Sequence, residues 1–200
     1  MTNPVRLPLF PLKTVLFPRG KLPLRIFEAR YIDMVKLCMR QNSGFGILNI
    51  REGREVKTKS LDHAPSLSIM GTEVRIIDFD QIEGNLLGIL VEGFGRFKVK
   101  NSWEEKDHLL MGEVEPIKDE ADCKLLENDG ALVKILKELV KHPMVEKLKL
   151  GIDYSNGVDV SYRLTELLPL DLTVKQSLLE LVDTQQRLLE LNKLVKGFQK

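Results

Sequence analysis

The spacing of apolar residues along the chain changes twice. The first 26 residues carry short apolar runs interrupted by five prolines. Proline is excluded from helix interiors and central strands, so this pattern predicts extended pieces joined by bends, with one strand over Leu22–Ile26. A helix is then predicted over Glu28–Gln41, because apolar residues recur there at i, i+3, i+4 and i+7: Tyr31, Met34, Val35 and Cys38.

From Phe45 to Pro116 the apolar residues alternate with polar ones, which is typical of strands. Turns are expected at three glycine-containing segments: Arg51–Arg54, Glu83–Asn85 and Gly93–Gly95. The strands between them are expected over 45–50, 67–79 (one strand or two), 86–91, 96–100 and 108–117. Several short strands with glycine turns indicate a mostly antiparallel barrel or curled sheet.

After Pro116 the helical spacing returns. It predicts a helix over Asp119–Lys141, a short helical piece over Met144–Leu150 and a helix over Val158–Leu168. A last helix is expected to begin at Thr173, with Gln176 completing a capping box, and to end near Gly197. The chain is thus divided into a β part, residues 1–118, and a helical part, residues 119–200.

The composition is that of an ordinary globular protein: 43% hydrophobic and 30% charged residues, with a net charge of +1. We see no membrane span and no signal peptide, so a cytoplasmic protein is expected, with its two cysteines reduced. Residues 1–60 carry twelve basic and four acidic residues. We favour pairing with the acidic segment 61–118 over nucleic-acid binding, which the near-neutral total makes unlikely.

Three stretches resemble the N-terminal, substrate-binding domain of the ATP-dependent Lon protease. The first is the proline-punctuated start up to Tyr31. The second is Gly71-Thr72 with the hydrophobic alternation after it, followed by Val91–Val99 with its Gly-x-x-Arg turn. The third is Leu167–Leu181, which reads Pro-Leu-x-x-x-x-Lys-Gln at its centre. The resemblance implies an α+β fold: an N-terminal PUA-like β pseudo-barrel with one helix, followed by a C-terminal helical bundle. It also implies recognition of unfolded or tagged polypeptides.

The nucleotide-binding pattern Gly-x-x-x-x-Gly-Lys-Ser/Thr is missing from this sequence. We therefore expect a stand-alone Lon-type domain without ATPase or protease activity of its own, and not an enzyme. The alternative is a PUA-like module that binds RNA or a nucleotide. A hydrolase without a visible motif is a third possibility, for which we find no positive feature.

Candidate binding residues are the aromatic side chains of the first segment. Most of them are expected in the core, and any left exposed between the β and helical parts would form an apolar groove for a peptide: Phe10, Phe17, Phe27 and Tyr31. The resemblance also singles out Glu28 and Arg96. They are expected to form a structural ion pair, with contact to a ligand as the alternative.

We expect no catalytic residue, metal or cofactor. Lys175 and Ser177 are two positions apart on a helix, which places them on different faces and argues against a Ser–Lys dyad. The histidines His63, His108 and His142 are far apart, and the acidic run Asp78–Asp80 with Glu83 lacks the remaining spacing of a calcium loop. The ligand and the oligomeric state stay open, since the leucines near Leu188–Leu194 suit either the core or a second copy.

Overall fold

The computed structural model describes residues 5–52, 66–82 and 86–198. These residues form two compact units, Met1–Lys118 and Asp119–Lys200, and each unit is described by itself below. The hairpin turn expected at 83–85, residues 53–54 of the turn expected at 51–54, and His63 lie outside the described residues.

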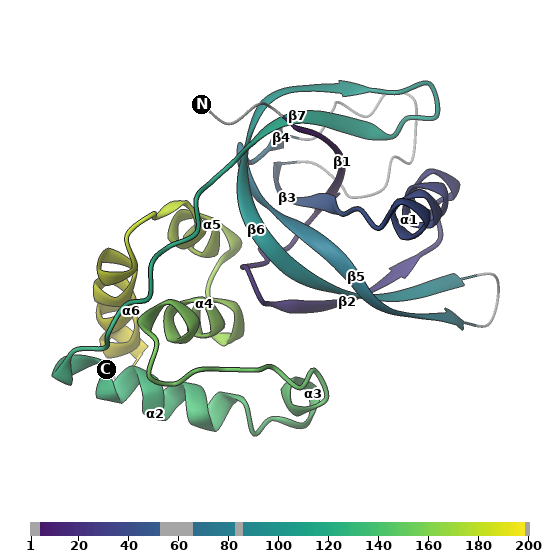
Figure 1. Cartoon of the computed structure of the whole chain (residues 1–200). Coiled ribbons are helices and arrows are strands. Elements are labelled where there is room, and N and C mark those ends of the chain that lie inside the picture. Colours follow the sequence, from purple (N-terminus) through teal and green to yellow (C-terminus); the bar gives the residue numbers. More distant parts are fainter. Residues whose placement is uncertain (1–4, 53–65, 83–85, 199–200) are drawn as a thin grey trace. The chain divides into compact units, whose positions relative to one another are not determined.

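The first unit is a barrel closed by five strands (Figure 1). The strands are β1 (Val5–Leu12), β3 (Phe45–Glu52), β5 (Met70–Ile82), β6 (Leu86–Glu104) and β7 (Leu110–Pro116). They pair in the order β1–β7–β6–β5–β3, and each of these pairings is antiparallel. The ring closes because β3 also pairs with β1, in the parallel direction, with Leu9 opposite Gly46.

Within the described part of the unit, two further strands pair with strands of this ring. β4 (Ser66–Leu67) pairs with β3, and β2 (Lys21–Ile26) pairs with the first part of β6. Among the described strands, β2 has a partner along one edge only. Pro23 lies within β2, and a proline has no N–H to donate, so it suits such an edge strand.

The turn expected at Gly93–Gly95 is wrong, because β6 runs unbroken from Leu86 to Glu104. The register with β5 shifts at this point: Glu73 pairs with Gly95, and Val74 pairs with Gly93. Phe94 is thus an extra residue in β6, a β-bulge that bends the strand without ending it. The two glycines that indicated a turn serve to accommodate this bulge.

Helix α1 (Ala29–Gln41) agrees with the predicted one within a residue, and its expected face is buried. Tyr31 stacks on Phe10 of β1, with 4.0 Å between the ring centroids. Asn42 ends the helix in the left-handed conformation, with φ of 49°. The α1 face belongs to a core with apolar residues of β2, β3, β5 and β6, including Ile26, Phe45, Val74 and Ile89.

The described residues of the second unit, 119–198, form one short 3₁₀ turn and five helices. They are η1 (Glu127–Asp129), α2 (Gly130–Leu139), α3 (Pro143–Glu146), α4 (Gly157–Leu167), α5 (Leu172–Glu180) and α6 (Thr184–Phe198). The helix expected over Asp119–Lys141 is therefore wrong in its first part. Residues 119–126 are extended, which places Lys124 in a bridge with Asn156 and turns Glu120 into the interior.

The single last helix expected from Thr173 to Gly197 is also wrong. It begins one residue earlier, at Leu172 after the N-cap Asp171, and it is interrupted between Glu180 and Thr184. Arg187 compensates for the interruption, because its guanidinium donates hydrogen bonds to the carbonyls of Leu178 and Leu181 near the end of α5. The Asp183 side chain accepts from the Gln185 N–H at the start of α6.

Candidate functional site

A surface pocket of 460 Å³ lies in the first unit where β2, β5 and β6 run side by side. We call it the β2–β5–β6 pocket. Its lining comes from three residues of each strand: Pro23, Leu24 and Arg25; Asp78, Phe79 and Asp80; Gly88, Ile89 and Leu90. The volume lies in the range of binding sites for small ligands or for a few side chains of a peptide.

The strand register explains why the surface is hollow at this point. Gly88 of β6 pairs with Arg25 of β2 on one side and with Asp80 of β5 on the other. Paired residues share one face of the sheet, so a cation and an anion flank a position that has no side chain. The Cα atoms of the two outer strands are about 10 Å apart across this position. The resulting gap has apolar neighbours in the next row, Pro23 and Leu90.

An exposed aromatic ring stands at the pocket. Phe79 pairs with Ile89, which is buried, yet Phe79 itself is 58% exposed. Phe27, which directly follows β2, is also 58% exposed. Since Ile26 pairs with Leu87, both phenylalanines lie toward the same end of the β5–β6 pair. Large exposed aromatic side chains of this kind are characteristic of protein-binding surfaces.

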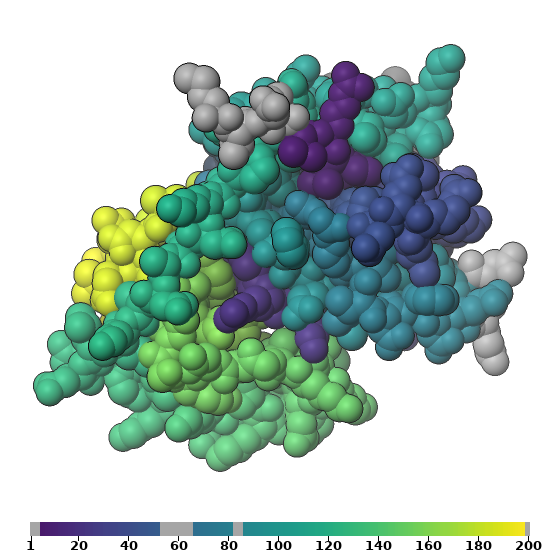
Figure 2. All heavy atoms as spheres, viewed as in Figure 1, coloured from purple at the N-terminus to yellow at the C-terminus, as the bar shows by residue number. Residues whose placement is uncertain are grey.

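A third exposed aromatic residue is Phe94, on the bulge of β6, with 64% of its surface exposed. The Arg75 guanidinium lies over its ring, 5.1 Å from the centroid. Arg75 also donates a 2.9 Å hydrogen bond to the carbonyl of Asn42, so it connects β5 to the end of α1. Figure 2 shows α1 and β5 as neighbours on the surface of this unit.

The four aromatic residues proposed from the sequence separate into two groups. Phe10, Phe17 and Tyr31 are buried, with exposed fractions of 8%, 0% and 4%. Burial raises the pKa of Tyr31 to about 12, as expected for a phenol held in the core. Phe27 alone of the four presents its ring at the surface.

Glu28 and Arg96 occupy different regions of the first unit. Glu28 pairs with Arg30, at 2.7 Å, and Arg30 in turn donates to the carbonyl of His108. Arg96 is 3% exposed, in the second half of β6 opposite Thr72. Ile26 pairs with Leu87, nine positions before Arg96, which is about 30 Å along a strand. We expected the Glu28 carboxylate to pair with Arg96, but in the structure it pairs with Arg30.

The Lys175 and Ser177 side chains have separate partners. Lys175 Nζ donates a 2.6 Å hydrogen bond to the carbonyl of Glu166, and Ser177 Oγ donates to the carbonyl of Thr173. Burial lowers the pKa of Lys175, opposed in part by the nearby Glu166 charge. Neither side chain is arranged to activate the other.

No group of three or more His, Cys, Asp or Glu side chains that is placed to hold a metal ion occurs within 5–52, 66–82 and 86–198. His142 instead caps α3, where its Nδ1 accepts a hydrogen bond from the N–H of Met144. Asp78 accepts one from the N–H of Phe79. These contacts are structural ones.

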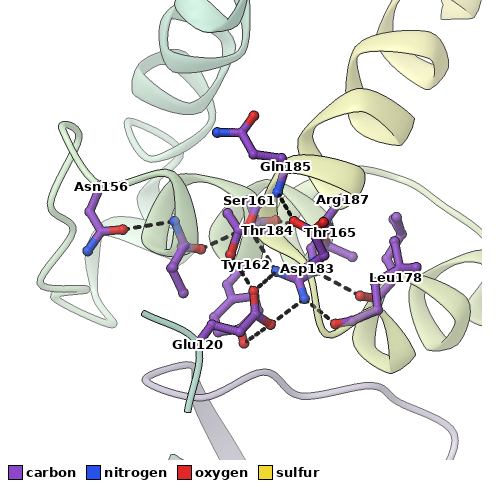
Figure 3. A network of polar contacts seen from close by, with 12 residues as sticks. Glu120, Asn156, Ser161, Tyr162, Thr165, Leu178, Asp183, Thr184, Gln185 and Arg187 are labelled. Carbon is purple, nitrogen blue, oxygen red and sulfur yellow. Dashed lines mark hydrogen bonds and ion pairs between the residues drawn. The ribbon is translucent and has the colours of Figure 1, made fainter. Parts of the chain in front are cut away.

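A buried polar network occupies the second unit (Figure 3). The Arg187 guanidinium contacts both oxygens of the Glu120 carboxylate, which also accepts hydrogen bonds from the hydroxyls of Tyr162 and Thr184. The Arg187 side chain is 0% exposed and that of Glu120 is 5% exposed. A substrate has no access to these groups, so we assign them to the stability of the unit.

In the sequence, the run Asp78-Phe79-Asp80 is noticeable for its acidic residues, and the phenylalanine between them is the one apolar side chain of the run. Whether that ring is covered depends on segments distant in sequence. The sequence alone could not decide this.

The architecture of the chain is thus a closed barrel with an outer strand β2, followed in sequence by a unit of helices. A family profile, the ATP-dependent protease La (LON) substrate-binding domain, matches residues 6–197. The chain belongs to this family. The resemblance noted in the sequence is thereby confirmed.

Two solved structures and one longer protein illustrate the relationship. The crystal structure of a Lon N-terminal domain protein from Xanthomonas campestris is 33% identical, with a TM-score of 0.74 over 94% of this chain and 96% of that one. The N-terminal domain of the Mycobacterium avium complex Lon protease shares the fold, with 18% identity, a TM-score of 0.57 and coverage of 92% and 94%.

Lon protease 2 of Myxococcus xanthus is 26% identical over 193 residues, which are 92% of this chain and 23% of that protein. The chain thus spans about a quarter of the length of the curated relatives it matches. Among the described helices, none has the length and apolar character needed to cross a lipid bilayer.

Proposed function

We propose that this protein is a non-catalytic polypeptide-binding domain that takes up apolar segments of unfolded or tagged proteins at the β2–β5–β6 pocket. The observation that carries the proposal is the exposure of Phe79, 58%, at a pocket lined by apolar side chains, by Arg25 and by the carboxylates of Asp78 and Asp80. Membership of a substrate-binding family supports the same function.

The finer architecture is part of this proposal. We interpret the ring β1–β7–β6–β5–β3 as a PUA-like pseudo-barrel and the second unit as a helical bundle. The absence of ATPase and protease activity is likewise proposed. It rests on the match to a substrate-binding domain over residues 6–197.

The binding would use side chains on both sides of an extended segment. An extended peptide presents a side chain every second residue to one face, so one apolar side chain can enter the gap above Gly88 while another side chain of the peptide contacts the exposed ring of Phe79, which also lines the pocket. Arg25 and Asp80 at the sides of the gap can bind the peptide carbonyl and N–H groups. This recognition is tolerant of sequence, because it needs only apolar side chains and a free backbone.

The test is a fluorescence-anisotropy titration of the full chain with a labelled unfolded protein. The cysteines of the labelled protein are blocked as carboxamidomethyl groups, which keep that protein unfolded and add no charge to it. We expect Phe79→Ser to weaken binding about tenfold, the effect of one well-packed contact of about 1.4 kcal/mol. Phe27→Ser is expected to act in the same direction.

The chain offers a matched control. Phe198 in α6 is also 58% exposed but lies in the second unit, so Phe198→Ser removes the same side chain from another surface and should leave the affinity unchanged. Equal losses for Phe79→Ser and Phe198→Ser would contradict the proposed pocket. A labelled single-stranded RNA is titrated in parallel at low and moderate salt. RNA binding that collapses with salt, without binding of the unfolded protein, would replace the proposal by the nucleic-acid alternative.

A further inference from the structure

A second groove, of 730 Å³, lies entirely among residues of the second unit. Its apolar lining consists of Ile135 and Leu139 of α2, Val145 of α3 and Leu167 at the end of α4. Lys134, Glu138, Lys141 and His142 stand around this apolar lining. We call it the α2–α3 groove; none of its lining belongs to the β2–β5–β6 pocket.

The groove exists because α2 carries two apolar stripes. Leu132 and Leu136 are 0% exposed and form the buried side of the helix. Ile135 and Leu139 are one helical turn apart on the neighbouring stripe and are only half-buried. A helix needs one apolar stripe to pack in a small unit, so the second stripe is left for a partner.

The charge around the groove differs from that of the rest of its unit. Residues 131–150 carry five lysines against two glutamates, whereas the remainder of 119–200 carries seven basic against twelve acidic residues. Most of the groove lining therefore comes from a basic segment of a unit whose remaining residues are acidic on balance. This charge asymmetry favours an occupant with acidic residues beside its apolar ones.

We propose that the α2–α3 groove binds a short acidic amphipathic segment of a partner protein, with leucine-like side chains on Ile135 and Leu139 and carboxylates near Lys134 and Lys141. Two apolar residues one turn apart on α2 match the spacing that an amphipathic helix presents from its own apolar face. Nucleic acid would satisfy the lysines but would leave the apolar lining without a partner.

The proposal is tested with the full chain and a fluorescein-labelled helical peptide whose leucines lie on one face and glutamates on the other. Leu139→Ser is expected to weaken binding about tenfold, and Lys141→Glu about fivefold, because an exposed charge contributes less than a buried apolar contact. A peptide with lysine in place of glutamate should not bind measurably.

Two control variants match these changes within the same unit. Lys141 pairs with Glu138, and Lys193 of α6 pairs with Glu190; both pairs are i,i+3, at 2.7 Å, with the lysines 68% and 70% exposed. Lys193→Glu therefore breaks an equivalent pair outside the groove and should leave peptide binding unchanged. Leu194→Ser, at another half-buried leucine of α6, is the control for Leu139→Ser.

Several outcomes would overturn the proposal. They are equal losses for Lys141→Glu and Lys193→Glu, no binding of the acidic peptide, or binding of single-stranded RNA in place of the peptide. A dimer of the free protein that Leu139→Ser dissociates would assign the groove to a second copy of the chain. Phe79→Ser should leave the acidic peptide's affinity unchanged, so failure of this proposal and failure of the proposed function are separate results.

Discussion

The Arg187 guanidinium and the Glu120 carboxylate form a buried ion pair between the last helix of the second unit and its extended first residues. Two guanidinium nitrogens lie 3.0 and 2.5 Å from the two carboxylate oxygens. The other hydrogen bonds of Arg187 reach the carbonyls of Leu178 and Leu181 and the hydroxyl of Ser161 in α4. One side chain of α6 therefore contacts three other segments: the first residues of the unit, α4 and the end of α5.

Removing one partner of this pair should destabilise the second unit strongly. Arg187→Met leaves the Glu120 carboxylate buried without its cation, and we expect a loss of about 3–5 kcal/mol in the free energy of unfolding. Lys193→Met, which breaks an exposed pair, should change it by less than about 1 kcal/mol. Urea unfolding followed by far-ultraviolet circular dichroism measures both changes.

The double variant Glu120→Leu/Arg187→Met separates the ion pair from the remaining contacts. Because both charges are then replaced by apolar groups, it should recover part of the stability lost by Arg187→Met alone. A single variant Arg187→Met that loses less than about 1 kcal/mol would contradict the assigned role of the pair.

The same pair should make the stability depend on pH. Burial by itself would raise the pKa of Glu120, but hydrogen bonds from Arg187 and Thr184, with the Arg187 charge, lower it below its ordinary value. A carboxyl whose folded-state pKa is lowered stabilises the fold above its unfolded pKa, about 4.3, and this contribution is lost as the pH falls through the folded-state pKa.

Unfolding free energies of the parent and of Glu120→Gln, measured between about pH 7 and pH 3, test this sign. The parent should be the more stable at neutral pH, and the two curves should approach each other as the solution becomes acidic. Glu115→Gln is the control: Lys100 lowers the pKa of that carboxyl as well, but on an exposed surface. A difference between parent and Glu120→Gln that grows toward low pH would contradict the assignment.

Local patterns predicted those parts of the fold that depend on neighbours in sequence. The helix Ala29–Gln41 and its buried face followed from spacing, and so did the strand Lys21–Ile26. The parallel pairing of β1 with β3 could not be predicted from local patterns, because closing the barrel depends on contacts between residues about 37 positions apart. The bulge at Phe94 was interpreted as a turn, since two glycines suit either structure.

The candidate sites were harder to predict for the same reason. Phe10 and Phe27 have the same side chain, yet one is 8% and the other 58% exposed. The difference arises because Phe10 faces Tyr31 of α1, a contact across the fold. Arg187 had no distinguishing signal in the sequence, since its partners Glu120 and Leu178 come together only in the folded unit.

Gly93 is required by a close approach of the chain to the β6 bulge. A Cβ atom on Gly93 would lie 2.3 Å from the carbonyl oxygen of Phe17, a backbone atom that cannot move aside easily. The Gly93 N–H donates to Gly20, and its carbonyl accepts from Arg19, so the contact is fixed on both sides. We expect Gly93→Ala to destabilise the first unit by about 1–3 kcal/mol, measured by urea unfolding.

Gly197→Ala is the matched control for that substitution. Nothing lies within 4 Å of a Cβ atom on Gly197, which is inside α6, so alanine should raise the stability by up to about 1 kcal/mol. If both glycine variants change the stability in the same direction, the steric explanation for Gly93 is wrong.

The two cysteines should differ in their reactivity toward a thiol reagent. Cys38 is 2% exposed and donates to the carbonyl of Gly44, and burial raises its pKa above the ordinary value of a thiol, which reduces the fraction of reactive thiolate. Cys123 is only partly buried, and its sulfur accepts a hydrogen bond from the Gln185 amide. In the folded protein we therefore expect Cys123 to react first with Ellman's reagent, and Cys38 only when the first unit opens.

Single-cysteine variants, Cys38→Ala and Cys123→Ser, allow each rate to be measured alone. Cys38 should react at least about a hundredfold more slowly than Cys123, because an opening that costs about 2.8 kcal/mol limits access by that factor. Denaturant should remove the difference, since both thiols are then exposed. Equal rates in the folded protein would mean that the core between α1 and the barrel opens far more readily than its packing implies. Gly93→Ala should also raise the Cys38 rate, since it destabilises the unit that contains this core, whereas Gly197→Ala should not.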